Sequence, residues 1–224
     1  MSAPPDPQRT HQLLQQLRQS YRTGRSLREA DLAPDWLSQL RAWIEEAVAA
    51  GILEPNAMVL ATASADGRPN ARSVLLRGLD ERGLHFFSNY RSAKGRELAE
   101  NPRATVVFPW TAMGRQVVAT GAVQQVPAEE SDAYFATRPR GHQLGAAASP
   151  QSQVVPDRAA LDRAMRDIAE RYPEGTPVPR PAYWGGYVLA PERVEFWEGR
   201  EDRLHDRLRY RATDGGWVLE RLAP

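Results

Sequence analysis

The stretch AMVLATAS-ADGRP-NARSVLLR, residues 57–77, decides the fold of this chain. Residues 57–64 form a run of β-type, mostly apolar residues, and residues 70–77 form a second run that returns along it. Between the two runs, residues 65–69 contain an Asp-Gly pair, which is typical of tight turns between antiparallel strands. The stretch therefore predicts a β-hairpin.

Further strands follow the hairpin, joined by short turns. Residues 103–110 and 115–126 form a second hairpin around residues 111–114. Because both hairpins close locally, the sheet should be antiparallel, and the repeated meander favours a closed or split barrel. The remaining predicted strands are 84–89, 186–190, 193–199, 207–213 and 217–222.

Five segments have helical rather than extended patterns. The clearest is 34–50, where Trp36, Leu40 and Trp43 share an apolar face and Gly51 supplies the stop. The other predicted helices are 11–23, 92–100, 128–137 and 156–171, with a disordered tip at 1–7 and a rigid Pro-rich connector at 174–181. The expected fold class is α+β, an antiparallel split β-barrel of about six to eight strands with peripheral helices.

The composition limits the possible functions. A chain of 224 residues suits one domain with at most an appended arm. Its 29 basic and 28 acidic residues nearly balance, which argues against a general nucleic-acid binder. Cys is absent from the sequence, so disulfides, thiolate zinc sites and thiolate nucleophiles are excluded. Without a targeting segment or an apolar run of membrane-spanning length, the expected location is the cytoplasm.

Common catalytic signatures are also absent from the sequence. It contains no G-x-G-x-x-G or P-loop pattern, no H-E-x-x-H and no G-x-S-x-G. The four His residues lack metal-ligand spacing, so no metal site is expected.

Arg, Lys and hydroxyl residues instead gather at predicted strand ends and helix starts, which are places that hold phosphate monoesters. The segments are 72–78, 87–96, 134–140, 196–199 and 203–207. The chain has 28 Arg but a single Lys, Lys94, at a predicted helix start. A cation there opposes the helix macrodipole unless an anion is present, so this position favours anion binding.

Taken singly, these residues also have ordinary structural explanations. Tyr134 and Arg138 lie four apart on a predicted helix and could reach one ligand or form a stacked surface pair. Arg203, His205 and Arg207 would share one face of a strand, which favours an anion or a carboxylate nearby. For that cluster, a ligand site and a structural role are equally supported.

Several stretches together make the sequence recognisable. They are RSVLLR (72–77), FPW (108–110), RQV (115–117), YF (134–135), RPR (138–140), WGG (184–186), EFW (195–197) and RLHDR (203–207). With them the chain resembles the pyridoxine/pyridoxamine 5′-phosphate oxidases over almost its whole length, from about Leu17 to Pro224. The last stretch separates these oxidases from the wider group of split-barrel flavin proteins.

The resemblance implies an FMN-binding split barrel that works as a homodimer, with FMN in clefts between the subunits. Residues 1–30 would be a mobile arm or lid, and residues 31–224 a single domain whose strands from about 182 to 224 are specific to the oxidases. The implied FMN contacts are Arg72, Ser73, Val74, Leu75, Leu76, Arg77, Phe87, Ser88, Lys94, Gln116, Gln151, Ser152, Trp197 and Arg207. The implied substrate contacts are Arg18, Tyr21, Arg77, Tyr134, Arg138, His142, Arg203 and His205.

The implied reaction is the oxidation of pyridoxine or pyridoxamine 5′-phosphate to pyridoxal 5′-phosphate, a step of vitamin B6 salvage and biosynthesis. Hydride passes from the substrate's C4′ to flavin N5, and dioxygen reoxidises the flavin to give hydrogen peroxide, with ammonia from the amine substrate. Arg203 and His205 would be the catalytic residues, holding the ring over flavin N5 and handling the proton lost from the alcohol or amine. The expected partners are therefore phosphorylated B6 vitamers and O2, with no nucleic acid and no membrane.

Arg72 and Arg77 raise a geometric difficulty, because residues five apart on an ideal strand point to opposite faces. A bulge, a strand end at Gly78 or contacts to two different phosphates would each resolve it. We expect two phosphates, one from FMN and one from the substrate.

The chain departs from the family's pattern near the expected phosphates. Ala93 stands where the family usually has a second Arg on the FMN phosphate, so FMN would bind roughly tenfold or more weakly. His142 occupies a usual Ser position, Ala147 a frequent Trp position, and Arg77 replaces a common Lys. These changes bear on affinity more than on reaction type.

Two other functions compete with the oxidase. One is a related FMN oxidase of another substrate, of the phenazine-pathway type, which the Tyr134 and Arg138 pair disfavours. The other is a non-catalytic protein that binds FMN or pyridoxal phosphate. Arg203 and His205 count against the second alternative, whereas Ala93 and His142 keep it open.

Overall fold

The computed structural model describes Arg9, Leu13, Leu14 and residues 26–224. The disordered tip expected at 1–7 and most of the helix expected at 11–23 lie outside the described residues. The site candidates Arg18 and Tyr21 lie outside them too, so the arm expected at 1–30 stays a prediction.

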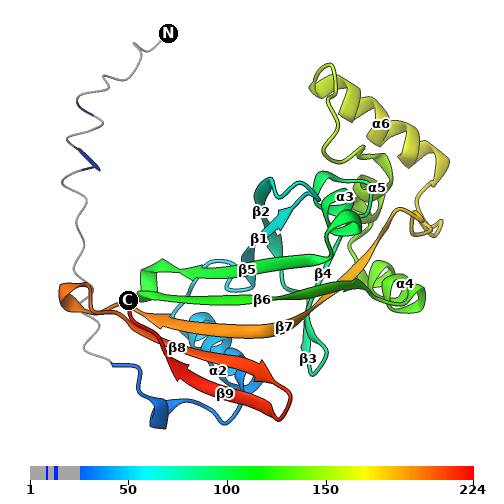
Figure 1. The fold of residues 1–224 in the computed structure, drawn as a ribbon. Coiled ribbons are helices and arrows are strands. Elements are labelled where there is room, and N and C mark those ends of the chain that lie inside the picture. The colour runs from blue at the N-terminus through cyan, green and yellow to red at the C-terminus, as the bar shows by residue number, and fades with distance from the viewer. Residues whose placement is uncertain (1–8, 10–12, 15–25) are drawn as a thin grey trace.

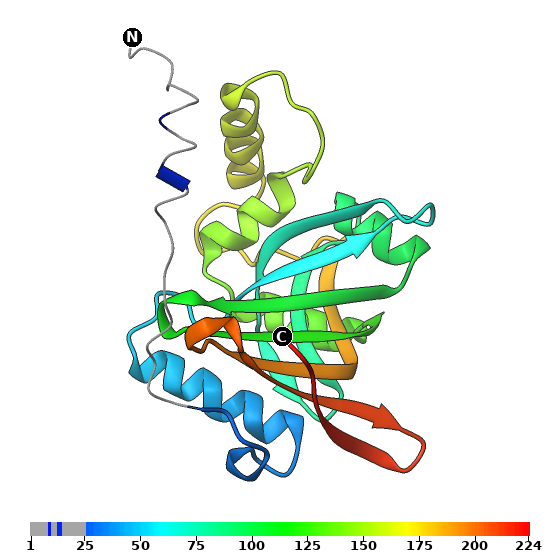
Figure 2. The same cartoon turned by 60° about the vertical axis from the view of Figure 1, so that its left-hand side comes forward.

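One antiparallel sheet forms the centre of the described chain (Figure 1). Its nine strands are β1 (Ala57–Ala63), β2 (Pro69–Leu75), β3 (Gly78–Asp80), β4 (Gly83–Asn89), β5 (Arg103–Trp110), β6 (Arg115–Gln125), β7 (Trp184–Glu198), β8 (Asp206–Thr213) and β9 (Gly216–Arg221). Seven strands follow the order β2-β1-β5-β6-β7-β4-β3, and the β8–β9 hairpin continues from β7. The sheet curls into an open half-barrel (Figure 2), which confirms the predicted fold class.

The two strands expected at 186–190 and 193–199 are in fact one strand, β7. The break was expected because Pro191 has no N–H to donate to a ladder. A β-bulge accommodates it: Thr120 pairs with Arg193 and Gly121 with Pro191, which leaves Glu192 as the extra residue. A Cβ on Gly121 would lie 1.9 Å from the carbonyl oxygen of Ala190, so only Gly fits opposite the bulge.

Five α-helices lie around the sheet in the described chain: α2 (Trp36–Ala49), α3 (Ala93–Glu100), α4 (Ala128–Thr137), α5 (Arg140–Ala148) and α6 (Arg158–Arg171). Single 3-10 turns occur at Glu29–Asp31, Thr111–Met113 and Glu201–Arg203. The helices α2, α3, α4 and α6 confirm predictions to within two residues at each end, whereas α5 was not predicted. Its nine residues include Gly141 and Gly145, and Gly is a poor helix former.

Two hydrophobic clusters hold these elements together. The larger packs α2 on the sheet, with Leu40, Trp43 and Phe196 almost fully buried. The smaller joins α4 and α5 to the start of β7 through Phe135, Leu144, Val178 and Trp184, and α6 packs against it through Met165 and Ile168. In Figure 1 these three helices gather at one end of β7, and the β8–β9 hairpin lies along the other. None of the described helices is long and apolar enough to cross a membrane.

Candidate active site

A cleft of about 560 Å³ opens where β2 ends, beside β4, the start of α3 and the junction of α4 with α5. Eleven of the predicted site residues line it: Ser73, Val74, Leu75, Arg77, Phe87, Ser88, Lys94, Tyr134, Arg138, His142 and Gln151. Thr137, Pro139 and Trp184 complete the lining and were not predicted as site residues. Pro139 and Trp184 do belong to the stretches RPR and WGG, so the family resemblance already held a signal for them.

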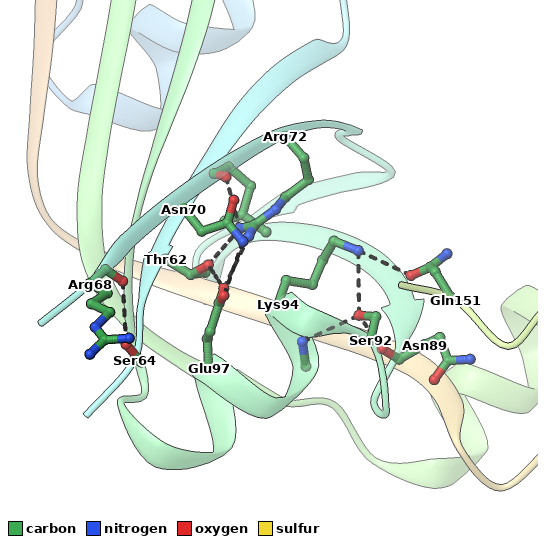
Figure 3. A network of polar contacts seen from close by, with 12 residues as sticks. Thr62, Ser64, Arg68, Asn70, Arg72, Asn89, Ser92, Lys94, Glu97 and Gln151 are labelled. Carbon is green, nitrogen blue, oxygen red and sulfur yellow. Dashed lines mark hydrogen bonds and ion pairs between the residues drawn. The ribbon is translucent and has the colours of Figure 1, made fainter. Parts of the chain in front are cut away.

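Lys94 lies in the first turn of α3, a helix capped by the Ser92 side chain, and is only 8% exposed. Its Nζ donates to Oε1 of Gln151 at 3.0 Å and to Oγ of Ser92 at 3.4 Å (Figure 3). Burial lowers the pKa of the Lys94 ammonium, and the positive charge of Arg72 lowers it further, against a smaller opposing effect of Glu97. A buried cation at a helix N-terminus is the arrangement that an anion stabilises most.

Arg72 does not line the cleft with Lys94. Its Nη2 lies 3.0 Å from Oε2 of Glu97, and its Nη1 donates to the hydroxyl of Thr62 and to the carbonyl of Leu60 (Figure 3). Strand β2 ends at Leu75, so Arg77 lies beyond the strand and is free to point into the cleft. A strand end thus accounts for the spacing of the two Arg residues, and the two-phosphate explanation stays a prediction.

An aromatic stack forms the opposite wall of the cleft. The ring centroids of Phe87 and Tyr134 are 3.8 Å apart, and Trp184 lies parallel to both. The Arg138 guanidinium lies over the Trp184 ring, with Cζ 4.6 Å from its centroid. The close approach of the Phe87 ring to the backbone of β7 needs Gly186, because a Cβ there would lie 2.8 Å from that ring.

Arg138 is the unsatisfied group of the cleft. Among the described residues its buried Nη1 has no hydrogen-bond partner, which is costly for a charged donor. Burial lowers the pKa of Arg138, an effect that the charge of Arg77 increases and Tyr134 opposes. None of the described lining residues is acidic. The lining thus offers three cations, one of them with an unpaired buried N–H, and two serines, a set that fits a phosphate monoester.

The remaining predicted residues lie elsewhere. Leu76 is buried beside the cleft, and Ser152 follows Gln151 with a φ of 69°. Gln116, Trp197 and Arg207 are register partners across β6, β7 and β8. Trp184 and Trp197 are separated by roughly 40 Å of strand, more than one small ligand spans. One chain therefore holds the predicted site as two separate groups.

The second group surrounds Trp197. The His205 ring lies 4.7 Å from the Trp197 ring, and its Nδ1 accepts the backbone N–H of Arg200 at 3.0 Å. Arg207 forms a two-pronged ion pair with Glu195, at 2.7 and 2.9 Å, which raises its pKa. Arg203 is exposed and has a φ of 61°, the left-handed region. The carboxylate expected near the cluster is present as Glu195, which pairs with Arg207. The shared strand face expected for residues 203, 205 and 207 is wrong, because Arg203 lies in a 3-10 turn and β8 begins only at Asp206.

The fold defines a class of protein, the split β-barrels. A structure from Nostoc punctiforme, described as a pyridoxamine 5′-phosphate oxidase-related, FMN binding protein, shares this fold with a TM-score of 0.66 at 20% identity, covering 87% of this chain and 100% of that one. Residues 44–172 match the family described as pyridoxamine 5′-phosphate oxidase, and residues 184–224 match the pyridoxine 5′-phosphate oxidase C-terminal dimerisation region.

Curated relatives agree with both matches. A pyridoxine/pyridoxamine 5′-phosphate oxidase of Salinispora arenicola is 58% identical over 93% of this chain and 95% of its own. One of Thermobifida fusca is 56% identical over 93% of this chain and 97% of its own. The chain belongs to the pyridoxine/pyridoxamine 5′-phosphate oxidase family, a family of oxidoreductases.

A more distant solved structure is PhzG of Burkholderia lata, in complex with tetrahydrophenazine-1-carboxylic acid. It is 33% identical, with a TM-score of 0.82, and the alignment covers 87% of this chain and 95% of that one.

Proposed function

We propose that this protein is an FMN-dependent oxidase that converts pyridoxine 5′-phosphate and pyridoxamine 5′-phosphate to pyridoxal 5′-phosphate. The observation that carries the proposal is the half-buried Arg138 side chain, which lies over Trp184 with its buried Nη1 unpaired among the described residues, in a cleft whose described lining has no acid. A substrate phosphate supplies the missing acceptor. Phosphorylated substrates are charged and cross lipid bilayers poorly, which favours the cytoplasm as the place where the enzyme acts.

The cleft offers separate groups for two phosphates. Lys94, with Ser73 and Ser88 beside it, would hold the FMN phosphate at the start of α3. Arg77, Tyr134, Arg138 and His142 would hold the substrate phosphate. The chemistry that bound FMN supplies is acceptance of hydride from the substrate's C4′ and delivery of electrons to dioxygen, giving hydrogen peroxide.

A second copy of the chain would complete the site. The group around Trp197 is too far along β7 to reach the cleft of its own chain, and it lies within residues 184–224, the part that matches a dimerisation region. In a homodimer, Arg203, His205 and Arg207 of one protomer would meet the cleft of its partner. The arm at 1–30 would bring Arg18 and Tyr21 over the substrate, on a single domain of residues 31–224.

Within the second group, the tautomer of His205 is set by its neighbours. Because Nδ1 accepts the Arg200 N–H, the proton of the neutral ring sits on Nε2. Nε2–H would donate to the pyridine ring's substituents, and Arg203 would supply positive charge beside it. These two side chains would orient the ring for hydride transfer through the charge and the N–H group that they present to it.

The second candidate is oxidation of a carboxylated phenazine precursor, as the ligand of the PhzG structure suggests. That ligand carries no phosphate, and it leaves the paired cations Arg77 and Arg138 without their best partner. A binding protein without turnover is the other alternative.

An absorbance spectrum of the purified protein under anaerobic conditions tests the proposal. Flavin bands that bleach on addition of pyridoxine 5′-phosphate and return with air are the expected result. A yellow protein bleached only by a reduced phenazine carboxylate would favour the second candidate, and one bleached by neither would be a binding protein.

Arg203→Ala sharpens this test, because it should slow bleaching while leaving flavin bound. Arg211→Ala is the matched control, since Arg211 pairs with Glu220 on the exposed β8–β9 hairpin and should bleach normally. Loss of flavin from the Arg203 variant, with normal turnover per bound flavin, would remove Arg203 from catalysis.

A further inference from the structure

Three distant segments of the chain meet at one carboxylate, that of Asp206. This residue is the first of β8, lies between His205 and Arg207, and is only 7% exposed. Its Oδ2 accepts the backbone N–H of Leu27 at 3.1 Å and Nη1 of Arg200 at 3.2 Å. Its Oδ1 accepts Nη1 of Arg221 at 2.7 Å. The segment at Leu27, the turn after β7 and the end of β9 are thereby tied together.

The contacts around Asp206 reinforce this junction. Nη2 of Arg221 donates to the carbonyl of Leu27 at 3.0 Å, and its Nε donates to Glu29 at 2.7 Å. The backbone of Leu222 donates to the carbonyl of Arg207 at 2.9 Å. The ordered chain that precedes α2 is therefore anchored to the start and the end of the β8–β9 hairpin.

The same carboxylate closes the turn that carries the expected catalytic residues. Arg200 contacts Asp206 through its side chain and His205 through its backbone N–H. Residues 200–206 are thus held at both ends, and Arg203 lies between them with a φ of 61°. A left-handed conformation at a residue other than Gly persists only where surrounding contacts enforce it. Asp206 supplies those contacts at the base of the turn.

We propose that Asp206 is a positioning residue of the oxidase. By holding Arg200 and the Leu27 segment, it fixes the His205 ring against Trp197 and orients Arg203, without touching the substrate itself. The charged groups around it, Arg200, Arg221 and Glu29, form a network in which Asp206 is the shared acceptor of two guanidinium groups. This role rests on the function proposed above.

The variant Asp206→Asn tests the role with little change in shape, because the amide keeps one acceptor oxygen but points N–H donors toward a cation. In the FMN-loaded enzyme, the limiting rate of anaerobic bleaching by pyridoxine 5′-phosphate should fall tenfold or more. The FMN dissociation constant should stay within about twofold, since Asp206 lies outside the cleft that holds Lys94 and Arg207 is held by Glu195 rather than by Asp206. Asp206→Glu should recover part of the rate.

Two matched controls separate positioning from a general loss of charge. Glu220→Gln removes a carboxylate that binds Arg209 and Arg211 on the same hairpin. Glu29→Gln removes the other acidic partner of Arg221 and leaves Asp206 intact. Both should bleach at the normal rate. If either slows bleaching as much as Asp206→Asn does, or if Asp206→Asn bleaches normally, the proposal is overturned.

Hydrogen exchange gives a readout that does not depend on activity. In the protein without substrate, Asp206→Asn should speed exchange together in peptides covering residues 26–30 and 199–205, and Glu29→Gln should not affect the second peptide. Faster exchange in only one of the two peptides would contradict the claim that Asp206 ties these two segments together. If Asp206→Asn does not fold, Arg200→Ala tests the same turn, since the 45% exposed side chain can be removed without touching the backbone bond to His205. A wild-type protein that never bleaches would refute the proposed function but leave the exchange result interpretable.

Discussion

The Arg138 guanidinium lies over the Trp184 ring, with Cζ 4.6 Å from the ring centroid, and its Nη1 has no partner among the described residues. Stacking on the indole stabilises the cation but offers no acceptor to the buried N–H. The nearby positive charge of Arg77 makes the arrangement less favourable still. The Nη1 N–H of Arg138 therefore lacks an acceptor in the described part of the chain, and we expect an anionic ligand to supply it.

Replacing Arg138 with Ala should therefore weaken substrate binding without lowering the stability of the fold. One charge-assisted bond contributes about 1.5–3 kcal/mol, so KM for pyridoxine 5′-phosphate should rise roughly 10- to 150-fold. The melting temperature without substrate should stay the same or rise, because an unsatisfied buried group is lost. Steady-state kinetics and a thermal melt measure the two effects.

Arg180→Ala is the control for that experiment. Arg180 also contacts Trp184, donating to its carbonyl at 2.6 Å, but it is fully engaged by Asp132 at 2.7 Å. Its loss should lower stability and leave KM unchanged. An Arg138 variant that melts early with a normal KM would assign Arg138 to the fold instead.

The binding of FMN should weaken as pH rises, through Lys94. Burial and Arg72 lower the pKa of Lys94 in the free protein, and a bound phosphate raises it again. Binding thus favours the protonated amine, and affinity is lost as pH rises through the lowered free-state pKa. The FMN phosphate is fully ionised above about pH 7 and adds no slope there. Titrations by flavin fluorescence from about pH 7 to 10 measure the effect.

Lys94→Arg provides the comparison, because guanidinium stays protonated over this range. Its FMN affinity should be nearly flat with pH, whatever its absolute value. The same slope in both proteins would mean that another group titrates.

Much of the fold could be predicted because it depends on neighbouring residues. The hairpins close over a few residues, and the apolar period of α2 is visible in the sequence. The continuity of β7 could not be predicted, because the bulge that accommodates Pro191 depends on Gly121, seventy residues earlier. Local patterns contain no information on such a pairing.

The candidate site likewise has features that neighbouring residues determine and features that depend on distant ones. Lys94 and Arg138 could be predicted from charge at a helix start and from the i, i+4 pair with Tyr134, and both line the cleft. The partners of Arg72 and Arg207 could not, because Glu97 and Glu195 reach them only through the packing of α3 and the register of β7 with β8. The sequence therefore predicted which basic groups line the cleft better than it predicted which basic groups are already paired with a carboxylate.

The buried ion pair beneath α2 should matter more for stability than any surface pair. Arg115 is 7% exposed and Glu198 3%, with Nε and Oε1 2.9 Å apart. Arg115→Met leaves Glu198 charged and buried, which costs about 3–5 kcal/mol. For a domain of this size that lowers the melting temperature by roughly 10 °C.

Arg103→Met is the surface counterpart, since Arg103 and its partner Glu192 are both about half exposed. Its effect should stay within about 1 kcal/mol. The double variant Arg115→Met, Glu198→Leu should regain most of the loss, because no buried charge remains. Equal destabilisation by the Arg115 and Arg103 variants would contradict the importance of burial.

Ala93 is the first residue of α3 and precedes Lys94, so Ala93→Arg places a second cation at this helix N-terminus. Without an anion the added charge opposes the helix macrodipole, and the melting temperature of the FMN-free protein should fall slightly. With FMN bound the new guanidinium can add a charge-assisted bond to the phosphate, tightening the dissociation constant tenfold or more. Ala93→Gln is the uncharged control. It should neither lower the melting temperature of the FMN-free protein nor tighten the FMN dissociation constant. Opposite shifts in the free and FMN-bound melting temperatures would establish that the phosphate lies at the start of α3, whereas a parallel fall in both would place it elsewhere.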